Sequence, residues 1–188
     1  MATKVKSSQS THPNILRIKG RSDVHLRRIN RDDVPELYDV MLNNRKHLQQ
    51  HLQTGDLTEK GVGEGVEWML KKMQKGSYLQ YRIIVGEKII GSVLLYDIDK
   101  KAGIAKTGIW VEKKSEGQGF ARAAMQRLMD YGFEKMGLKK VLFDIDPANE
   151  RSERLAQSLG GNVASDVITE KLENGRNFTY RVWDVING

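Results

Sequence analysis

Hydrophobic and polar positions change their spacing several times along the chain. The stretch VHLRRI (24–29) alternates apolar and polar residues, which predicts a strand. The segment behind it has candidate caps at Asn30 and Asp32, and its apolar residues recur at helical spacing: Val34, Leu37, Tyr38, Met41 and Leu42. A second helical pattern runs from about residue 65 to 75. This part of the chain therefore predicts one strand followed by two helices.

Alternation returns in the middle of the chain. The runs YLQYRIIVG (78–86) and KIIGSVLLYDID (88–99) are joined by the turn Gly-Glu-Lys, which predicts a β-hairpin. The run AKTGIWVEK (105–113) follows as a third strand in series.

A third helix is predicted after the glycines at 117 and 119, because apolar residues then recur with a period near 3.6 and stop at Gly137. The run KVLFDIDP (140–147) is a short strand, RSERLAQSLGG (151–161) a short helix, and residues 166–186 two strands around the turn Glu-Asn-Gly-Arg. The order β-α-α-β-β-β-α-β-α-β-β predicts an α+β fold: a sheet of mixed direction with helices on its faces.

Length and charge refine this picture. The 188 residues, 39% of them hydrophobic, suit one globular domain, which we place at residues 23–188 behind a flexible basic arm at residues 1–22. The whole chain has 31 basic and 24 acidic residues, and five of the basic ones precede the first acidic residue, Asp23, which leaves 26 against 24. Because the body is nearly balanced and shows no RNA-binding aromatic signature, zinc-finger spacing or repeat, specific nucleic-acid binding is not expected.

The absence of cysteine and of long apolar runs indicates where in the cell the protein is expected. The chain has no cysteine, so neither disulfides nor thiolate metal sites are available, and no metal is expected. No apolar run is as long as a membrane span, and the first residues lack the apolar segment of a secretory signal. We therefore expect a soluble cytoplasmic protein with no membrane partner.

The stretch SEGQGFARAAMQRL (115–128) places two flexible residues where a helix must begin. Gly117 and Gly119 can simply form a tight turn between a strand and a helix. Alternatively, the missing side chains let an anion reach the free backbone N–H groups of residues 118–121 at the positive end of the helix dipole. The stretch by itself leaves both interpretations open.

The element order and this junction together resemble the GNAT superfamily of acyl-CoA-dependent N-acetyltransferases. Its pyrophosphate loop follows Gln/Arg-x-x-Gly-x-Gly/Ala, and residues 116–121 read Glu-Gly-Gln-Gly-Phe-Ala. Gly119 and Ala121 match this pattern, whereas Glu116 replaces the usual Gln or Arg. The resemblance implies a GNAT fold with a mixed, mostly antiparallel twisted sheet of about seven strands and helices on both faces. It also favours the phosphate interpretation of the glycine pair.

Within the superfamily, three segments are similar to the Rim-type ribosomal-protein N-terminal acetyltransferases, above all the serine-acetylating member. ELYDVMLNNRKHLQQHL (36–52) resembles their first helix and the acceptor-side loop, and TGIWVEKKSEGQG (107–119) resembles their strand and phosphate loop. NERSERLAQSLGG (149–161) follows their Asn-x-x-Ser-x-x-x-Ala-x-x-x-Gly pattern. Three agreeing segments in order are more specific than any one of them.

This resemblance implies acetyl-CoA as the cofactor and a set of residues that contact it: Trp110, Val111, Gln118, Gly119, Phe120, Ala121, Arg122 and Asn149. Arg122 can instead point into solvent, and Asn149 can instead cap its helix. Lys113 and Lys114 could meet the 3′-phosphate. Ser152 occupies the place of the Rim-type proton donor, because the tyrosine that many GNAT enzymes use is Ala156 here.

The general base is not identified by the sequence. The two glutamates of the Rim-type pattern fall on Lys106 and Ala164, so both matches fail. Asp166, Glu170 and the histidines at positions 47 and 51 are nearby substitutes that can equally be surface residues.

The function implied by the resemblance is direct acetyl transfer to a primary amine, most plausibly the N-terminal α-amine of a protein. Residues 43–56 are the candidate segment for acceptor recognition. A small-molecule acetyltransferase for a polyamine, amino sugar or amino acid, and a non-catalytic acyl-CoA-binding module, remain as alternatives. Family members often pair through sheet edges, so a homodimer is a further expectation.

Overall fold

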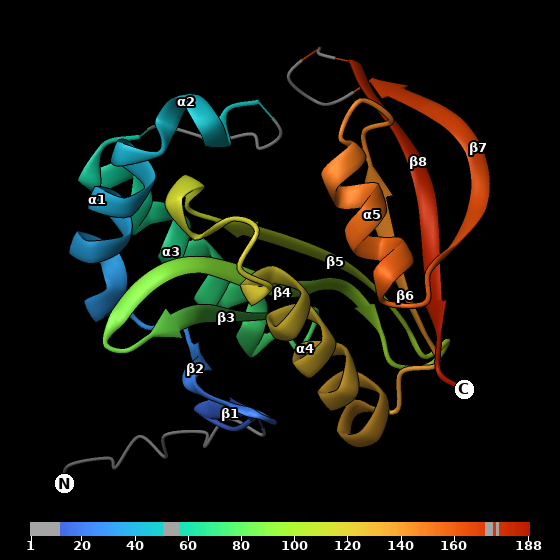
Figure 1. Cartoon of the computed structure of the whole chain (residues 1–188), viewed down its shortest axis with the longest axis horizontal. Helices are drawn as coiled ribbons and strands as arrows, with labels where there is room; N and C mark the ends of the chain where they lie inside the picture. Colours follow the sequence, from blue (N-terminus) through green and yellow to red (C-terminus); the bar gives the residue numbers. More distant parts are fainter. Residues whose placement is uncertain (1–11, 51–56, 172–174, 176) are drawn as a thin grey trace, which may run out of the picture.

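A single eight-stranded sheet forms the frame of the molecule, in the order β1-β2-β3-β4-β5-β6-β8-β7 (Figure 1). The computed structural model describes residues 12–50, 57–171, 175 and 177–188. The strands are β1 (Ile15–Ile18), β2 (Arg21–Arg28), β3 (Tyr78–Val85), β4 (Lys88–Asp99), β5 (Ile104–Val111), β6 (Lys140–Ile145), β7 (Asn162–Lys171) and β8 (Asn177–Ile186). Strands β5 and β6 run parallel, and all other neighbours run antiparallel.

Helices cover both faces of this sheet. They are α1 (Val34–Asn43), α2 (Arg45–Leu48), α3 (Glu59–Gln74), α4 (Phe120–Met136) and α5 (Glu150–Ser158), with short 3-10 turns η1 (Arg31–Asp33) and η2 (Lys113–Ser115). In Figure 1, α4 and α5 lie in front of the strands and α3 lies behind them. The predicted α+β architecture, with helices on both faces of a mostly antiparallel sheet, is therefore confirmed.

Alternating strand residues build two separate apolar cores. On one face, odd-numbered residues of β3, such as Leu79 and Tyr81, are buried with Leu128 and other residues of α4. On the other face, a smaller cluster of α1 and α3 residues packs around Val66, with Trp110 of β5 beside it. Since burying one such side chain contributes about 1.5–3 kcal/mol, these cores fix which face each strand residue occupies.

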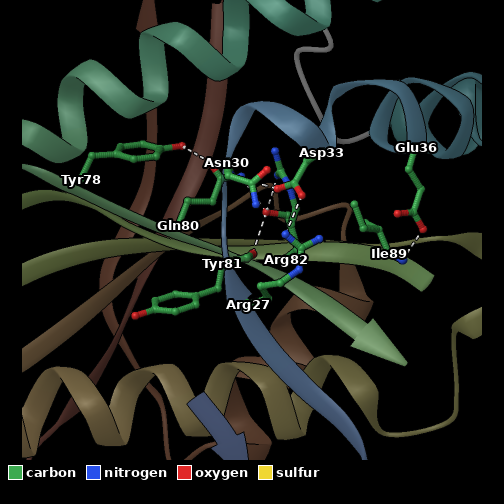
Figure 2. A network of polar contacts seen from close by, with 10 residues as sticks. Arg27, Asn30, Asp33, Glu36, Tyr78, Gln80, Tyr81, Arg82 and Ile89 are labelled. Carbon is green, nitrogen blue, oxygen red and sulfur yellow. Dashed lines mark hydrogen bonds and ion pairs between the residues drawn. The ribbon is translucent and has the colours of Figure 1, made fainter. Parts of the chain in front are cut away.

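A buried polar network attaches η1 and α1 to the second face of the sheet (Figure 2). The Asp33 carboxylate lies 2.7 Å from a guanidinium nitrogen of Arg27 and 3.5 Å from Nε of Arg82. Arg82 is 1% exposed, and burial lowers its pKa to about 10, although Asp33 acts in the opposite direction. Its Nη1 also donates to the hydroxyl of Ser92 (3.1 Å). A buried charge needs such partners, because removing one leaves the other uncompensated.

The start of the folded domain differs from the prediction. The seven predicted strands correspond to β2–β8, but β1 lies inside the segment assigned to a flexible arm and pairs with β2. Leu16 and Ile18 of β1 are buried in the α4 core, so the arm interpretation is wrong for residues 15–18. Four residues in a basic stretch carry too weak an alternation to reveal a strand, and burial under α4 supplies the missing stabilisation. Residues 1–11 lie outside the described part.

Helix boundaries also differ in two places. The first predicted helix ends at Asn43, and α2 begins two residues later, because the side chain of Asn44 donates to the carbonyl of Val40 and accepts from the amide of Lys113. Helix α3 begins earlier than predicted, at Glu59, behind the cap Thr58. The turn at 173–176 lies largely outside the described residues. Within the described ranges, no helix is long and apolar enough to cross a bilayer.

Candidate functional site

Two neighbouring strands part in the middle of the sheet. β5 pairs with β6 from Ile104 to Thr107, the last pair being Thr107 with Phe143. On its other side, β5 continues to pair with β4 as far as Val111. Among the described strands, residues 108–111 therefore have one edge that no strand pairs. Such an edge can bond a ligand that carries peptide-like amides.

The predicted phosphate loop leads from this edge to the start of α4. Gly117 and Gly119 both adopt left-handed backbone conformations, with φ of 74° and 77°. Gly119 is the N-cap residue of α4 and offers no side-chain cap, and the amide of Ala123 donates back to its carbonyl (3.0 Å). The first N–H groups of a helix have no intrahelical partner, and those at residues 119–122 lie at the positive end of the dipole of α4. The turn and the donor array are one structure.

Arg21 of β2 reaches this loop from the other side. Its Nη1 donates to the carbonyl of Gln118 (3.0 Å), and its guanidinium carbon lies 4.5 Å from the ring centroid of buried Phe120. A hollow of about 430 Å³ beside it is lined by Arg17, Arg21 and His25, among others. From the sequence, Arg21 is only one of the charges of the basic arm. No local pattern could reveal it, because 97 residues separate it from Gln118.

Arg122 has a third role that neither sequence interpretation named. Its Nη2 donates to the carbonyl of Ser158 (3.1 Å), at the C-terminal end of α5. A cation at this position interacts favourably with the negative end of a helix dipole. Arg122 therefore links α4 to α5, while its remaining N–H donors stay exposed to solvent or a ligand.

The start of α5 lies beside the phosphate loop. Oδ1 of Asn149 accepts the amide of Ser152 (3.2 Å), so the capping interpretation describes this oxygen, and the Nδ2 group is the part of Asn149 that can still bind a ligand. Ser152 is half-buried in the first turn. Arg151 between them forms an ion pair with Glu116 of the loop, which brings Asn149 and Ser152 to the same mouth as the free amides.

Glu116 of the phosphate loop lies close to three basic side chains. Its carboxylate lies 2.9 Å from Nζ of Lys113 and 3.2 Å from Nε2 of His47, in addition to Arg151. Burial acts to raise the pKa of Glu116, but the bonds from Lys113 and Arg151 outweigh it and lower the pKa. The departure from the family pattern is thus neutralised, and His47 is placed at the loop. His51 lies outside the described residues.

The two lysines before the loop are also paired. Nζ of Lys114 lies 3.4 Å from the buried carboxylate of Glu112, which in turn accepts the hydroxyl of Ser115 (2.8 Å). Lys113 pairs with Glu116 as described. Both lysines remain at the mouth, but a phosphate would compete with these carboxylates for them.

Trp110 and Val111 lie on the unpaired part of β5 and point to opposite faces. Trp110 packs against the α1 and α3 cluster, and Val111 packs against the core under α4. The carbonyl of Trp110 faces Gly91 of β4, so the backbone groups of Val111 are the ones that face the free edge, while the two side chains fix the strand from both sides.

A cluster of polar and aromatic side chains lies on the sheet face opposite α4, next to the point where β5 and β6 part. We call it the open-face cluster, and it consists of Tyr96, Lys106, Asp144, Glu170 and Tyr180. Nζ of Lys106 lies 2.7 Å from Oδ2 of Asp144 and 6.0 Å from the ring centroid of Tyr180. The hydroxyl of Tyr180 donates to Glu170 (2.6 Å).

Lys106 stays charged in this cluster. Burial acts to lower its pKa, but the hydrogen bond to Asp144 and the nearby charges of Asp97 and Glu170 raise the pKa above the ordinary value. A protonated lysine cannot accept a proton, so the residue at the expected glutamate position is not the base. Ala164 and Asp166 are exposed on the edge strand β7.

A buried carboxylate does lie beside Lys106, on the neighbouring strand β6. Asp144 directly follows the last β5–β6 pair, and its side chain is 8% exposed. The signal in the sequence is a carboxylate inside the otherwise apolar strand KVLFDI. The sequence does not tell on which face of the sheet this carboxylate lies. We did not predict it.

Comparison with known proteins agrees with this geometry. The model of the acetyltransferase (GNAT) domain matches residues 23–162. The N-acetyltransferase p20 of Bacillus licheniformis is 34% identical over 87 residues, 45% of this chain and 49% of its own length. Spermidine N(1)-acetyltransferase of Escherichia coli is 32% identical over 91 residues, 48% of each chain. The matched stretch thus spans about half the length of these relatives.

A solved structure extends the likeness to the whole fold. The structure of RimL, a ribosomal L7/L12 alpha-N-protein acetyltransferase in complex with coenzyme A, superposes with a TM-score of 0.81 at 20% identity. The match covers 92% of this chain and 97% of the other. Because the family model covers most of the chain and the uncapped α4 start lies inside it, the chain belongs to the GNAT acetyltransferase domain family.

Proposed function

We propose that this protein transfers an acetyl group from acetyl-CoA to a primary amine. The observation that carries the proposal is the continuity of two backbone surfaces: the free edge of β5 and the uncapped start of α4. The GNAT family membership supports it, as does the coenzyme A complex of the similar RimL structure.

The residues at this surface fit the parts of coenzyme A. The N–H groups at the start of α4 suit a diphosphate, because they combine free donors with the positive end of the helix dipole. Arg21 and the exposed donors of Arg122 add cationic contacts at the same end. The backbone at Val111, with Nδ2 of Asn149, suits the amides of the pantetheine arm. When bound, acetyl-CoA supplies the activated thioester.

The hydroxyl of Ser152 and the backbone N–H groups of β5 are the groups of this chain that we assign to the acetyl-transfer step. The hydroxyl of Ser152 lies in the first turn of α5 beside the loop and is assigned to give a proton to the departing sulfur. The free N–H groups of β5 suit the stabilisation of a developing oxyanion. Because the chain has no cysteine, its residues favour direct transfer over a thioester intermediate on the protein.

For the acceptor, we propose the N-terminal α-amine of a protein, as in the ribosomal type. The fold-wide likeness to RimL supports this choice. A small amine such as a polyamine is the second candidate, because the sequence is 32% identical to spermidine N(1)-acetyltransferase over its matched part.

The test combines cofactor binding with acceptor turnover. Calorimetry should show coenzyme A binding, and a thiol-release assay should show acetyl-CoA consumption with peptides that begin with serine or alanine. Spermidine serves as the small-amine arm, and a reaction without acceptor gives the hydrolysis background. Faster turnover of spermidine than of any peptide would favour the second candidate. Cofactor binding without turnover on either class would indicate a binding module, and no cofactor binding would refute the proposal.

A further inference from the structure

The open-face cluster has the features of a binding site that the cofactor does not use. We infer that Asp144 and Glu170 bind the amine of the acceptor as it arrives in its ammonium form, carried on a neutral or cationic chain. The bound amine then loses one proton to solvent before its nitrogen attacks the thioester carbon. This inference rests on the proposed function and specifies its substrate class.

Position is the first argument. Residues of β5 and β6 alternate, so that Ala105, Val141 and Phe143 lie in the α4 core, and Lys106 and Asp144 therefore face the opposite side. Because Asp144 follows the last β5–β6 pair, its side chain stands at the point where the free edge of β5 begins. An acceptor bound on this face would reach the proposed path of the pantetheine arm where β5 and β6 part. It would approach from the face of the sheet that α4 does not cover.

An unsatisfied buried oxygen is the second argument. Lys106 occupies Oδ2 of Asp144 at 2.7 Å, while Oδ1 is buried and has no hydrogen-bond partner among the described residues. A buried carboxylate oxygen without a donor is unfavourable, and an N–H donor from a ligand would satisfy it. Lys106 is a positioning residue in this arrangement, because it fixes one oxygen and leaves the other without a donor.

Charge is the third argument. The cluster contains two carboxylates and one ammonium, and Asp97 adds a further negative charge in its field. An ammonium ligand would balance this excess, whereas a carboxylate beside the reacting amine would meet like charges. The cluster thus selects against acidic acceptors.

The aromatic side chains supply the fourth argument. Tyr180 is buried, its ring stacks on Phe178 with centroids 5.1 Å apart, and Nζ of Lys106 lies over the same ring. An ammonium near a tyrosine face is stabilised by the ring quadrupole. Lys106 shows that this position already accommodates an ammonium group. Glu170 accepts the Tyr180 hydroxyl and is exposed, so one of its oxygens can reach a second cationic group.

The experiment measures acceptor and cofactor binding separately. The variants are Asp144→Asn and Glu170→Gln, with Asp166→Asn as a matched control that removes an exposed carboxylate from the same edge strand. Spermidine is titrated into the protein saturated with coenzyme A, and kcat/KM is measured for it and for a serine-initiated peptide amide. Since a charged hydrogen bond contributes about 1.5–3 kcal/mol, Asp144→Asn should weaken acceptor binding roughly 10- to 100-fold, and Glu170→Gln about fivefold.

The outcomes separate this inference from the proposed function. All three variants should bind coenzyme A within about twofold of the wild type. If they bind it normally and Asp144→Asn and Glu170→Gln match Asp166→Asn in acceptor affinity, the inference is overturned while the function stands. Absence of acceptor binding to the wild-type complex would also overturn it. Loss of coenzyme A binding in the wild type would instead overturn the proposed function.

A wild-type comparison covers the case in which Asp144→Asn fails to fold. Two serine-initiated peptide amides are compared, one with lysine at the second and third positions and one with glutamate. The lysine peptide should have the higher kcat/KM, by about tenfold, because the cluster repels carboxylates near the amine. A preference for the glutamate peptide would overturn the inference without any variant.

Discussion

The phosphate loop and the open-face cluster are built in opposite ways. The loop is one contiguous stretch, residues 116–121, whose functional groups are mostly backbone amides. The cluster takes single side chains from β4, β5, β6, β7 and β8, which span residues 96–180. Backbone geometry in the loop depends on glycine at two positions, whereas the cluster depends on the register of five strands. The first kind of site leaves a motif in the sequence, and the second does not.

This difference also predicts how each site tolerates change. A donor array made of amides is insensitive to most side chains but sensitive to anything that fills or distorts the turn. A site made of side chains is sensitive to each of them and to the packing that sets their faces. The following experiments test the contrast in order of expected effect.

The largest effect is expected for Gly119→Glu. Gly119 has a φ of 77°, and the new carboxylate would stand next to the free amides, where it would repel a diphosphate and compete for the donors. Losing two charged hydrogen bonds predicts an affinity for coenzyme A more than about 100-fold weaker. Gly86→Glu is the control, because Gly86 also has a positive φ but lies in the β3–β4 turn. Equal affinity of both variants in calorimetry would place the cradle elsewhere.

Ser152→Ala tests a side chain that acts beside the backbone array. Removing a proton donor should reduce kcat by about 100-fold, while the affinity for coenzyme A stays the same. The control is Ser158→Ala in the last turn of α5, whose hydroxyl donates only to the carbonyl of Leu155. Both constants come from the thiol-release assay and calorimetry. Unchanged turnover would remove the role assigned to Ser152.

Arg21→Ala tests whether the backbone amides bind coenzyme A without the help of this side chain. Losing one charged contact to the loop should weaken the affinity for coenzyme A about tenfold, and the loss should shrink at high salt. Arg154→Ala removes an equal charge from an exposed i,i+4 ion pair with Glu150 and serves as the control. If Arg21→Ala behaves like Arg154→Ala, Arg21 is not part of the phosphate site.

The smallest effect is expected for the hydrogen bond between Tyr180 and Glu170 in the open-face cluster. The hydrogen bond to Glu170 raises the pKa of Tyr180 to about 12. Because this pKa lies above the ordinary value near 10, the bond stabilises the fold below about pH 10, and the contribution disappears as the pH rises to 12. Glu170→Gln should return the pKa of Tyr180 toward its ordinary value, which the difference in tyrosinate absorbance between the variant and the wild type would show. Identical titrations would contradict the bond.

Particular residues show where sequence reasoning succeeded and where it stopped. The left-handed glycines and the start of α4 were predictable, because conformational preference and helical period are local properties. Arg21 and Asp144 were not, since their roles depend on partners 97 and 38 positions away. The cap that Asn149 forms with Ser152 was one of the two interpretations that the sequence offered for this residue, whereas the contacts of Glu116 with Lys113, Arg151 and His47 could not all be derived from spacing.

The sequence by itself determined most of the elements, the α+β class and the glycine turn before α4, because hydrophobic period, turn residues and glycine freedom act within a few residues. The tertiary structure alone decided that β1 joins the sheet, that β5 and β6 part after Thr107, and that Asp144 and Lys106 share one face. Those outcomes depend on long-range strand register and on burial under α4, and the free energy of packing is set by the whole assembled sheet.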